Sequence, residues 1–311
     1  MQIGFIGAGA MGAPMVRNLL AAGHTVAVHT RSPESAAKLV ADGATWAATP
    51  AAAADAATFV FACLPGPAEI EQIVEAPGGL LQTMPSDSVY IDTSTSAPAL
   101  VRRLCAAFAE RGVAMLDAPV SGGPKGAATR KLAIWTSGDE AAFDRARPLL
   151  GTLGDQVRYL GGSGNATVAK LVHNVANYGI FTVLAEAMTL GVRAGVDPAT
   201  LWAAIRQGSL GRQRAVDRLA DQFLPGEFDA PAFTLALAHK DVTLATGLAR
   251  DLGVPMRLAG LTHADMTEAL NRGWGARDSR AAMLLQQERS SVAIKVPRDA
   301  LRAILDDEPL G

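Results

Sequence analysis

The chain has 311 residues, of which 49% are hydrophobic and 19% are charged, and its formal net charge is −2. This composition is typical of a globular protein large enough for two ordinary domains, and it excludes a disordered chain. The small net charge gives no electrostatic reason to bind nucleic acid or an anionic membrane, so we expect neither partner.

Cysteine and histidine spacing argues against disulfides and metals. The two cysteines, Cys63 and Cys105, form no CxxC pair, and the five histidines include no HxxxH spacing. No basic residues precede the apolar start of the chain, and no apolar run approaches the length of a membrane span. We therefore expect a cytoplasmic, metal-free protein.

The first predicted elements form a nucleotide-binding unit. Strand 2–6 leads into the turn Gly7-Ala8-Gly9-Ala10-Met11-Gly12, which is followed by a helix. In this GxGxxG spacing Gly7 permits the tight turn, Gly9 lets the backbone approach phosphates, and Gly12 lets helix and strand pack closely. The start of the helix offers free N–H groups and the positive end of its dipole. With a second strand at 25–29, the pattern predicts dinucleotide binding.

The end of strand 25–29 bears on the choice of cofactor. An acidic residue there would bind the ribose hydroxyl of NAD and repel the 2′-phosphate of NADP. This chain instead has Thr30 and Arg31, and the guanidinium of Arg31 suits a phosphate. Glu34 follows Pro33 and is expected in the first turn of the next helix. The sequence favours NADP over NAD; the alternative is that Arg31 is a solvated loop residue.

Strands and helices continue to alternate up to residue 160. Helices are predicted at 51–56, 68–74, 100–111 and 140–150, and strands at 58–64, 88–91, 114–117, 132–136 and 157–160. Such alternation predicts a doubly wound, mostly parallel sheet with helices on both faces, the Rossmann arrangement. Ligands bind beyond the carboxyl ends of such strands, where Leu64, Pro65 and Thr95 would lie.

A loop at 118–126 carries Ser121, Gly122 and Gly123. Its backbone N–H groups and serine hydroxyl could cradle a carboxylate, although an ordinary Gly-Pro turn would have the same composition.

One long helix is expected at 166–193, after a glycine-rich entry and before the next proline, Pro198. At 1.5 Å per residue it would span roughly 45 Å and could connect two lobes. Thr167, Lys170 and Asn174 recur at three- and four-residue spacing, which places them on one face. We interpret this face as a candidate active site. The alternative is that Lys170 is a surface lysine whose stem lies along apolar neighbours.

The remaining predicted elements are helices, at 201–207, 215–222, 235–252, 256–271 and 279–291. We therefore predict a Rossmann domain at residues 1–162, an all-α domain at 163–296 joined to it by the long helix, and a tail at 297–311 that is a short helix or a loose end.

Four segments in this order resemble the β-hydroxyacid dehydrogenase family. This family includes 3-hydroxyisobutyrate dehydrogenases, semialdehyde reductases and, more distantly, 6-phosphogluconate dehydrogenases. The segments are residues 4–15, 117–123, 161–174 and 240–242. The resemblance implies a substrate cleft between the two domains, entered by the long helix. It also implies an NAD(P)-dependent oxidoreductase that acts on a small 3-hydroxy acid, and a homodimer or homotetramer.

The resemblance also assigns roles to residues. It implies that Lys170 is the catalytic lysine and that Asn174 orients the substrate. The substrate carboxylate would meet Ser121, Gly122 and Gly123. The dinucleotide would contact Leu64, Pro65, Thr95 and, at its nicotinamide end, Lys240. As a general acid and base, Lys170 needs a pKa well below the ordinary lysine value, lowered by burial or by a neighbour such as Lys240.

Two residues depart from the family pattern. Arg130 stands where many members have glycine, and His173 stands where hydroxyisobutyrate-type enzymes usually have asparagine. The His173–Asn174 pair is reminiscent of 6-phosphogluconate dehydrogenases. Alternatives are therefore an enzyme of that type, an imine-reducing enzyme or a non-catalytic dinucleotide-binding module, but Lys170, Asn174 and Ser121 together favour a hydroxyacid dehydrogenase. Candidate specificity residues are 209–212 and Phe233.

Overall fold

The computed structural model describes residues 1–212 and 217–306. It divides into two compact units, Met1–Ala176 and Asn177–Gly311, and the division falls inside helix α9 (Asn165–Arg193). The first unit extends past residue 162 because the first turns of α9 pack into it, where Ala166, Thr167 and Lys170 are buried.

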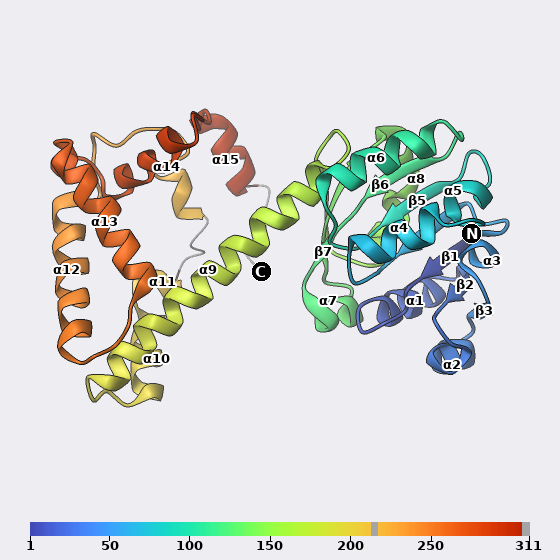
Figure 1. The fold of residues 1–311 in the computed structure, drawn as a ribbon, viewed down its shortest axis with the longest axis horizontal. Coiled ribbons are helices and arrows are strands. Elements are labelled where there is room, and N and C mark those ends of the chain that lie inside the picture. Colours follow the sequence, from blue (N-terminus) through green and yellow to red (C-terminus); the bar gives the residue numbers. More distant parts are fainter. Residues whose placement is uncertain (213–216, 307–311) are drawn as a thin grey trace. The chain divides into compact units, whose positions relative to one another are not determined.

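The first unit is built on a mostly parallel sheet with the strand order β3-β2-β1-β4-β5-β6-β8-β7, and β9 pairs with β8 (Figure 1). Only the pairs β6–β8 and β7–β8 are antiparallel within the described sheet. The strands are β1 (Gln2–Ile6), β2 (Thr25–His29), β3 (Thr45–Ala47), β4 (Phe59–Ala62), β5 (Val89–Asp92), β6 (Ala114–Asp117), β7 (Val120–Ser121), β8 (Ala133–Gly138) and β9 (Gln156–Tyr159). The chain reverses direction across the sheet between β1 and β4, which confirms the doubly wound Rossmann prediction.

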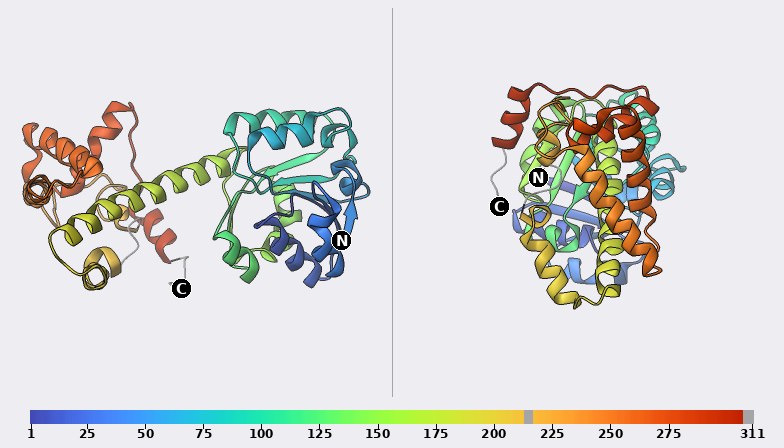
Figure 2. Two further views of the ribbon diagram at one scale, coloured as in Figure 1. Left: turned by 60° about the horizontal axis from the view of Figure 1, so that its bottom comes forward. Right: turned by 90° about the vertical axis from the view of Figure 1, so that its left-hand side faces the viewer.

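Helices cover both faces of this sheet (Figure 2). They are α1 (Gly12–Ala21), α2 (Pro33–Ala41), α3 (Pro50–Ala54), α4 (Pro67–Glu75), α5 (Leu80–Thr83), α6 (Pro98–Ala109), α7 (Gly123–Thr129) and α8 (Glu140–Gly151). Phe5 and Ile6, neighbours on β1, belong to different core clusters. This is expected because successive side chains of a strand point to opposite faces.

The prediction of an irregular loop at 118–126 is wrong. Val120 pairs with Ile134 to form β7, and Gly123 begins helix α7 with Pro124 in its first turn. Glycine and proline together usually indicate a turn. Here the segment forms a strand and a helix instead, because Val120 pairs with β8 and a helix accepts proline in its first turn. The short elements β3 and α5 carry too few residues to show a period, and the sequence analysis missed them.

All regular elements in the described part of the second unit are helices, apart from one isolated bridge between Thr234 and Asp278. Its elements are α10 (Pro198–Gln207), α11 (Ser209–Arg212), η1 (Asp217–Ala220), α12 (Leu235–Asp251), α13 (Arg257–Asn271), η2 (Trp274–Ala276), η3 (Ser279–Met283), α14 (Leu284–Arg289) and α15 (Arg298–Asp306). The helix predicted at 215–222 begins outside the described residues, and the rest of it is the 3₁₀ turn η1 followed by turns. The helix predicted at 279–291 is split into η3 and α14.

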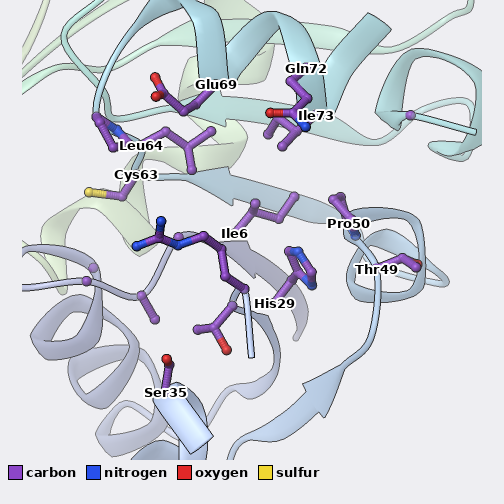
Figure 3. A pocket seen from close by; sticks show the side chains of 18 of the residues that line it. Ile6, His29, Ser35, Thr49, Pro50, Cys63, Leu64, Glu69, Gln72 and Ile73 are labelled. Carbon is purple, nitrogen blue, oxygen red and sulfur yellow. The ribbon is translucent and has the colours of Figure 1, made fainter. Parts of the chain in front are cut away.

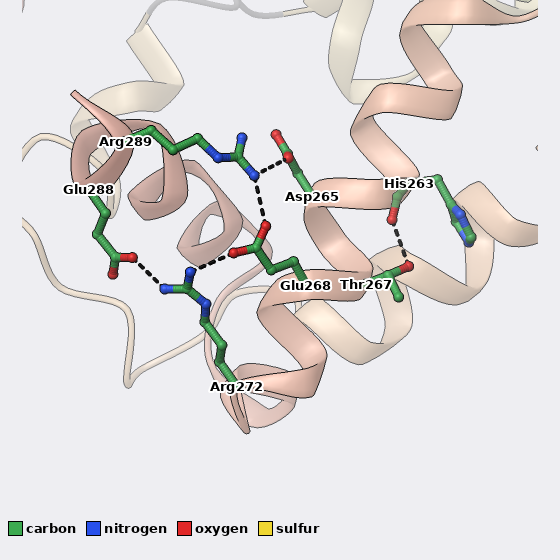
Figure 4. A network of polar contacts seen from close by, with 7 residues as sticks. All are labelled: His263, Asp265, Thr267, Glu268, Arg272, Glu288 and Arg289. Atoms are coloured by element: carbon green, nitrogen blue, oxygen red, sulfur yellow. Dashed lines mark hydrogen bonds and ion pairs between the residues drawn. The ribbon is translucent and has the colours of Figure 1, made fainter.

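A surface ion-pair network joins α13 to α14 (Figure 4). Arg289 bonds Asp265 at 2.7 Å and Glu268 at 2.8 Å, while Arg272 bonds both Glu268 and Glu288. Solvent screens each of these exposed pairs, so the network adds little to the stability of the fold. We therefore interpret it as a surface link between the two helices and not as a functional site.

By length and composition alone, α9 could cross a membrane, so the expectation that no stretch approaches that length is wrong by this measure. Such a single helix is weak evidence, because helices of soluble proteins meet the same criterion. The first turns of α9 carry a buried lysine and a threonine bonded to a carboxylate of the sheet, contacts that belong to a protein interior rather than to lipid.

Candidate active site

At two of the three glycines in the turn after β1, the surrounding protein leaves no room for a side chain. Gly7 has a φ of +90°, and a Cβ there would lie 2.4 Å from the carbonyl oxygen of Cys63. A Cβ on Gly12 would lie 2.2 Å from the carbonyl oxygen of Gly7. A Cβ on Gly9 would meet nothing within 4 Å. Gly9 therefore leaves open space beside the turn, as a bound pyrophosphate requires.

Helix α1 begins at this turn without a cap. Met11 makes no side-chain cap bond, and the first turn carries no acidic residue. The first N–H groups of a helix lack intrahelical partners, and they attract anions together with the helix dipole. The start of α1 therefore suits phosphate.

A cleft of about 850 Å³ lies against this turn (Figure 3). This volume falls within the range of small-molecule and cofactor sites, roughly 300–1,000 Å³. Of the residues predicted to bind the cofactor, those lining the cleft are Gly7, Ala8, Gly9, Ala10, Met11, Gly12, Thr30, Arg31, Leu64 and Pro65. Thr95 follows β5 and is not among the lining residues, and the side chain of Lys240 lies outside the described part.

The sequence analysis missed the far walls of the cleft. Figure 3 shows Glu69 and Ile73, beside the predicted Leu64, facing His29 and Ser35. His29 ends β2, Ser35 lies in the first turn of α2, and Glu69 and Ile73 lie in the first two turns of α4. Their position after the carboxyl ends of parallel strands is the sequence signal that could have identified them.

The end of β2 forms a polar corner of the cleft. Thr30 is buried and its hydroxyl donates to the carbonyl oxygen of Ser32 at 2.7 Å, while Arg31 is exposed. Glu34 lies in the first turn of α2, as predicted, where hydrogen bonds with its own backbone N–H and with Ser32 lower the pKa of its carboxyl. This corner therefore presents an exposed guanidinium on its loop.

Lys170 is buried on α9, only 9% exposed. Its Nζ lies 6.0 Å from the ring centroid of Trp135 on β8. Among the side chains that the structure describes, none forms a hydrogen bond or ion pair with this ammonium. Burial lowers the pKa of Lys170 below the ordinary lysine value. These surroundings differ from those of a solvated surface lysine.

Residues around Lys170 come from β7, β8 and α9. His173 lies 3.3 Å from the Ser121 hydroxyl, measured from its Nε2, and its ring centroid lies 5.2 Å from that of Trp135. Burial, and then the charge of Lys170, lower the pKa of His173. Asn174 is half-buried on the same helix. The structure thus brings Ser121 and His173 into contact beside Lys170, with Trp135 as a residue that the sequence analysis missed.

Gly122 and Gly123 lie between Ser121 and the body of α7. Their φ values are +131° and +62°, in the region that favours glycine. At the other end of α7, Arg130 has a left-handed φ of +59° as the C-terminal cap. This is a backbone conformation that favours glycine. The Nε of Arg130 approaches the Asn18 side chain of α1 at 3.5 Å.

Two buried carboxylates end neighbouring strands of the sheet. Asp92 of β5 and Asp117 of β6 are register partners, and both are at most 2% exposed. Burial is the main reason that the pKa of Asp92 is raised from 3.8 to about 6; hydrogen bonds from Ser94 oppose the rise and the charge of Asp117 adds to it. The sequence analysis gave neither carboxylate a role.

Gly9→Ala provides a test of the cofactor site. The added methyl group enters open space in the free protein, so folding stability should change little, but it occupies the room left for the pyrophosphate. Overpacking of this kind costs about 1–3 kcal/mol. The Kd of NADPH should therefore rise by roughly tenfold to a hundredfold in a calorimetric titration. Unchanged affinity in a folded variant would place the dinucleotide elsewhere.

The chain matches two family models. Residues 2–161 match the NAD-binding domain of 6-phosphogluconate dehydrogenase, and residues 164–285 match the NAD-binding domain of NADP-dependent 3-hydroxyisobutyrate dehydrogenase.

Individual proteins are similar over most of their length. The chain is 32% identical to 2-(hydroxymethyl)glutarate dehydrogenase of Eubacterium barkeri, covering 94% of this chain and 97% of that one. It is 38% identical to 3-hydroxyisobutyrate dehydrogenase of Pseudomonas aeruginosa, covering 68% and 70%. Among solved structures, a reductive aminase from Aspergillus terreus in complex with NADPH, cyclohexanone and allyl amine has a TM-score of 0.74 at 25% identity, covering 91% and 98%.

Proposed function

The chain belongs to the β-hydroxyacid dehydrogenase family, and we propose that Lys170 is the general acid and base of its reaction. The protein is an NAD(P)-dependent oxidoreductase that transfers a hydride between a nicotinamide and a small 3-hydroxy acid or the corresponding semialdehyde or keto acid. The observation that carries the role of Lys170 is its burial without a counter-ion among the described side chains, beside the Ser121 loop.

Lys170 can exchange one proton with the substrate oxygen. The ammonium donates it when a carbonyl is reduced, and the neutral amine takes it back when the alcohol is oxidised. Burial favours the neutral amine, so it lowers the pKa of Lys170 in the direction that this exchange requires. Asn174, one turn later, offers donors and an acceptor without competing for this proton. Ser121, Gly122 and Gly123 would hold the carboxylate through the hydroxyl and backbone N–H groups.

The cofactor residues in this proposal are those of the glycine turn and the cleft, together with Thr95 and Lys240 by family resemblance. A bound nicotinamide supplies or accepts the hydride. NADP is favoured because Arg31 stands at the polar corner, where an acid would select NAD.

Arg31→Ala tests this cofactor preference. A hydrogen bond to a charged group is worth about 1.5–3 kcal/mol, so losing the guanidinium should weaken NADPH binding roughly tenfold or more. NADH lacks the 2′-phosphate, and its affinity should change little. Fluorescence titration of both cofactors against the variant would measure the difference. Equal losses for both would contradict a phosphate-binding role.

Imine reduction is the second candidate, because a reductive aminase shares the fold and part of the sequence. The set Lys170, Asn174 and Ser121 supports hydroxy acid chemistry instead, as the family resemblance implies. A spectrophotometric panel distinguishes the two: NADPH and NADH are each offered glyoxylate, succinic, methylmalonate and tartronate semialdehydes, and a cyclic imine. Turnover of a semialdehyde supports the proposal, and turnover of the imine alone contradicts it.

The remaining assignments follow from the family resemblance. The protein is expected to be a cytoplasmic homodimer or homotetramer, with residues 163–296 supplying the subunit contacts. Light scattering coupled to gel filtration would measure the mass of the assembly.

A further inference from the structure

Asp117 is a buried carboxylate that the reaction described above does not use. It ends strand β6 and is 2% exposed. Its Oδ1 accepts hydrogen bonds from the Ser137 hydroxyl at 2.6 Å and from the Gly164 N–H at 3.1 Å. Its Oδ2 accepts from the N–H and the hydroxyl of Thr167, at 2.9 and 3.0 Å. The carboxylate therefore accepts four hydrogen bonds without contact with solvent.

These bonds tie the start of α9 to the sheet. The Ser137 hydroxyl also accepts from the Ala166 N–H at 2.9 Å. Asp117 and Ser137 thus satisfy N–H groups at Gly164, Ala166 and Thr167, which a helix start otherwise leaves without partners. A negative charge at this end is also favoured by the helix dipole. The cap of α9 is supplied by distant strands rather than by its own preceding residues.

Lys170 lies three residues after Thr167, on the same face of α9. No described side chain bonds its ammonium, so the placement of Lys170 depends on the placement of the helix backbone. Trp135, whose ring centroid lies 6.0 Å from this Nζ, is two residues before Ser137 on β8, and residues two apart on a strand face the same side. Strand β8 therefore contacts Lys170 through Trp135 and the start of α9 through Ser137.

We propose that Asp117 is a positioning residue for catalysis, which holds the first turn of α9 so that Lys170 meets the substrate oxygen. This inference rests on the proposed role of Lys170. A cap that served only the fold would stabilise the protein without any selective effect on the lysine.

A double-mutant cycle distinguishes these roles. Turnover, NADPH affinity and the unfolding temperature are measured for Asp117→Asn, Lys170→Ala and the double variant. A misplacement of about 1 Å can cost about a hundredfold in rate. Asp117→Asn should therefore lower kcat by roughly tenfold to a hundredfold and keep NADPH affinity. In the Lys170→Ala background it should lower the residual turnover no further, because effects of coupled residues are not additive.

Asp139→Asn is the matched control. Asp139 caps α8 by accepting from the Ala142 N–H at 2.7 Å, so this change also replaces a capping carboxylate with an amide, at a different helix. It should leave kcat unchanged, and the unfolding temperature should change little because asparagine also caps helices. If Asp117→Asn does not fold, Thr167→Val removes one of the four bonds, and Thr167→Ser restores it. Valine should lower kcat and serine should retain it.

The pH profile gives a further readout. Loosening the first turn of α9 should expose Lys170 to water, so the apparent pKa in kcat/KM should move up towards that of ordinary lysine. The inference would be overturned if Asp117→Asn left turnover unchanged, or if it lowered turnover equally in the parent and in the Lys170→Ala background.

Two outcomes separate this inference from the proposed function. Near-normal turnover of Lys170→Ala would overturn both. Low turnover of Lys170→Ala together with full turnover of Asp117→Asn would overturn only the role of Asp117.

Discussion

Lys170→Ala should lower turnover by about 10² to 10⁴-fold, the usual contribution of a positioned general acid and base. The loss should appear in kcat, because the lysine acts on the proton that moves during reaction. NADPH binding should be preserved, since the cleft that fits the dinucleotide is lined by residues up to Gly79 and not by α9. Steady-state kinetics with a reducible semialdehyde, together with a cofactor titration, would measure both quantities.

Lys170→Arg separates proton transfer from positive charge. Arginine keeps the charge but does not lose a proton at any working pH, so it should be nearly as impaired as alanine. Lys295→Ala removes an exposed lysine of the second unit and should leave kcat unchanged. High activity of the arginine variant would mean that Lys170 contributes charge alone.

Asp92→Asn should stabilise the protein at neutral and alkaline pH. The fold raises the pKa of Asp92 from 3.8 to about 6, mainly by burial. At about 1.4 kcal/mol per pKa unit, this difference corresponds to about 3 kcal/mol of destabilisation when the carboxyl is ionised. Asparagine keeps an oxygen that can accept from the Ser94 N–H, which bonds Asp92 Oδ1 at 3.0 Å, and it carries no charge.

The sign of the pH dependence follows from the direction of this shift. The folded protein holds the Asp92 proton more tightly than the unfolded chain does. The contribution of Asp92 to stability is therefore complete below pH 3.8 and is lost as the pH rises through about 6. The two proteins should therefore differ most above pH 6 and converge below pH 4. Urea unfolding at pH 8 and pH 4 would measure this. A variant that is no more stable than the parent at pH 8 would contradict the account.

The sequence predicted the regular part of the Rossmann unit well because local signals and tertiary packing agree there. Strands β1, β2 and β6 have the predicted bounds. The glycine turn was predictable because a Cβ at Gly7 or Gly12 would clash with a backbone carbonyl oxygen. The long helix was predicted because no proline occurs between its glycine-rich entry and Pro198.

The parts that the sequence did not predict depend on residues far apart along the chain. Asp117 bonds Thr167 across fifty positions, and no local pattern indicates that a strand-end aspartate caps a distant helix. Trp135 is placed beside Lys170 only by the pairing of β8 in the sheet. The segment 118–126 becomes β7 and α7 because Val120 finds a partner strand, which composition alone does not reveal.

The most direct measurement is the fate of a deuterium label carried at C4 of NADPH during reduction of a semialdehyde, compared between the parent protein and Lys170→Ala. The account predicts that mass spectrometry and NMR find the label on the former carbonyl carbon of a hydroxy acid, and that the variant forms this product about 10² to 10⁴-fold more slowly. Cofactor binding without label transfer to any semialdehyde, or label transfer at an equal rate in the variant, would contradict it.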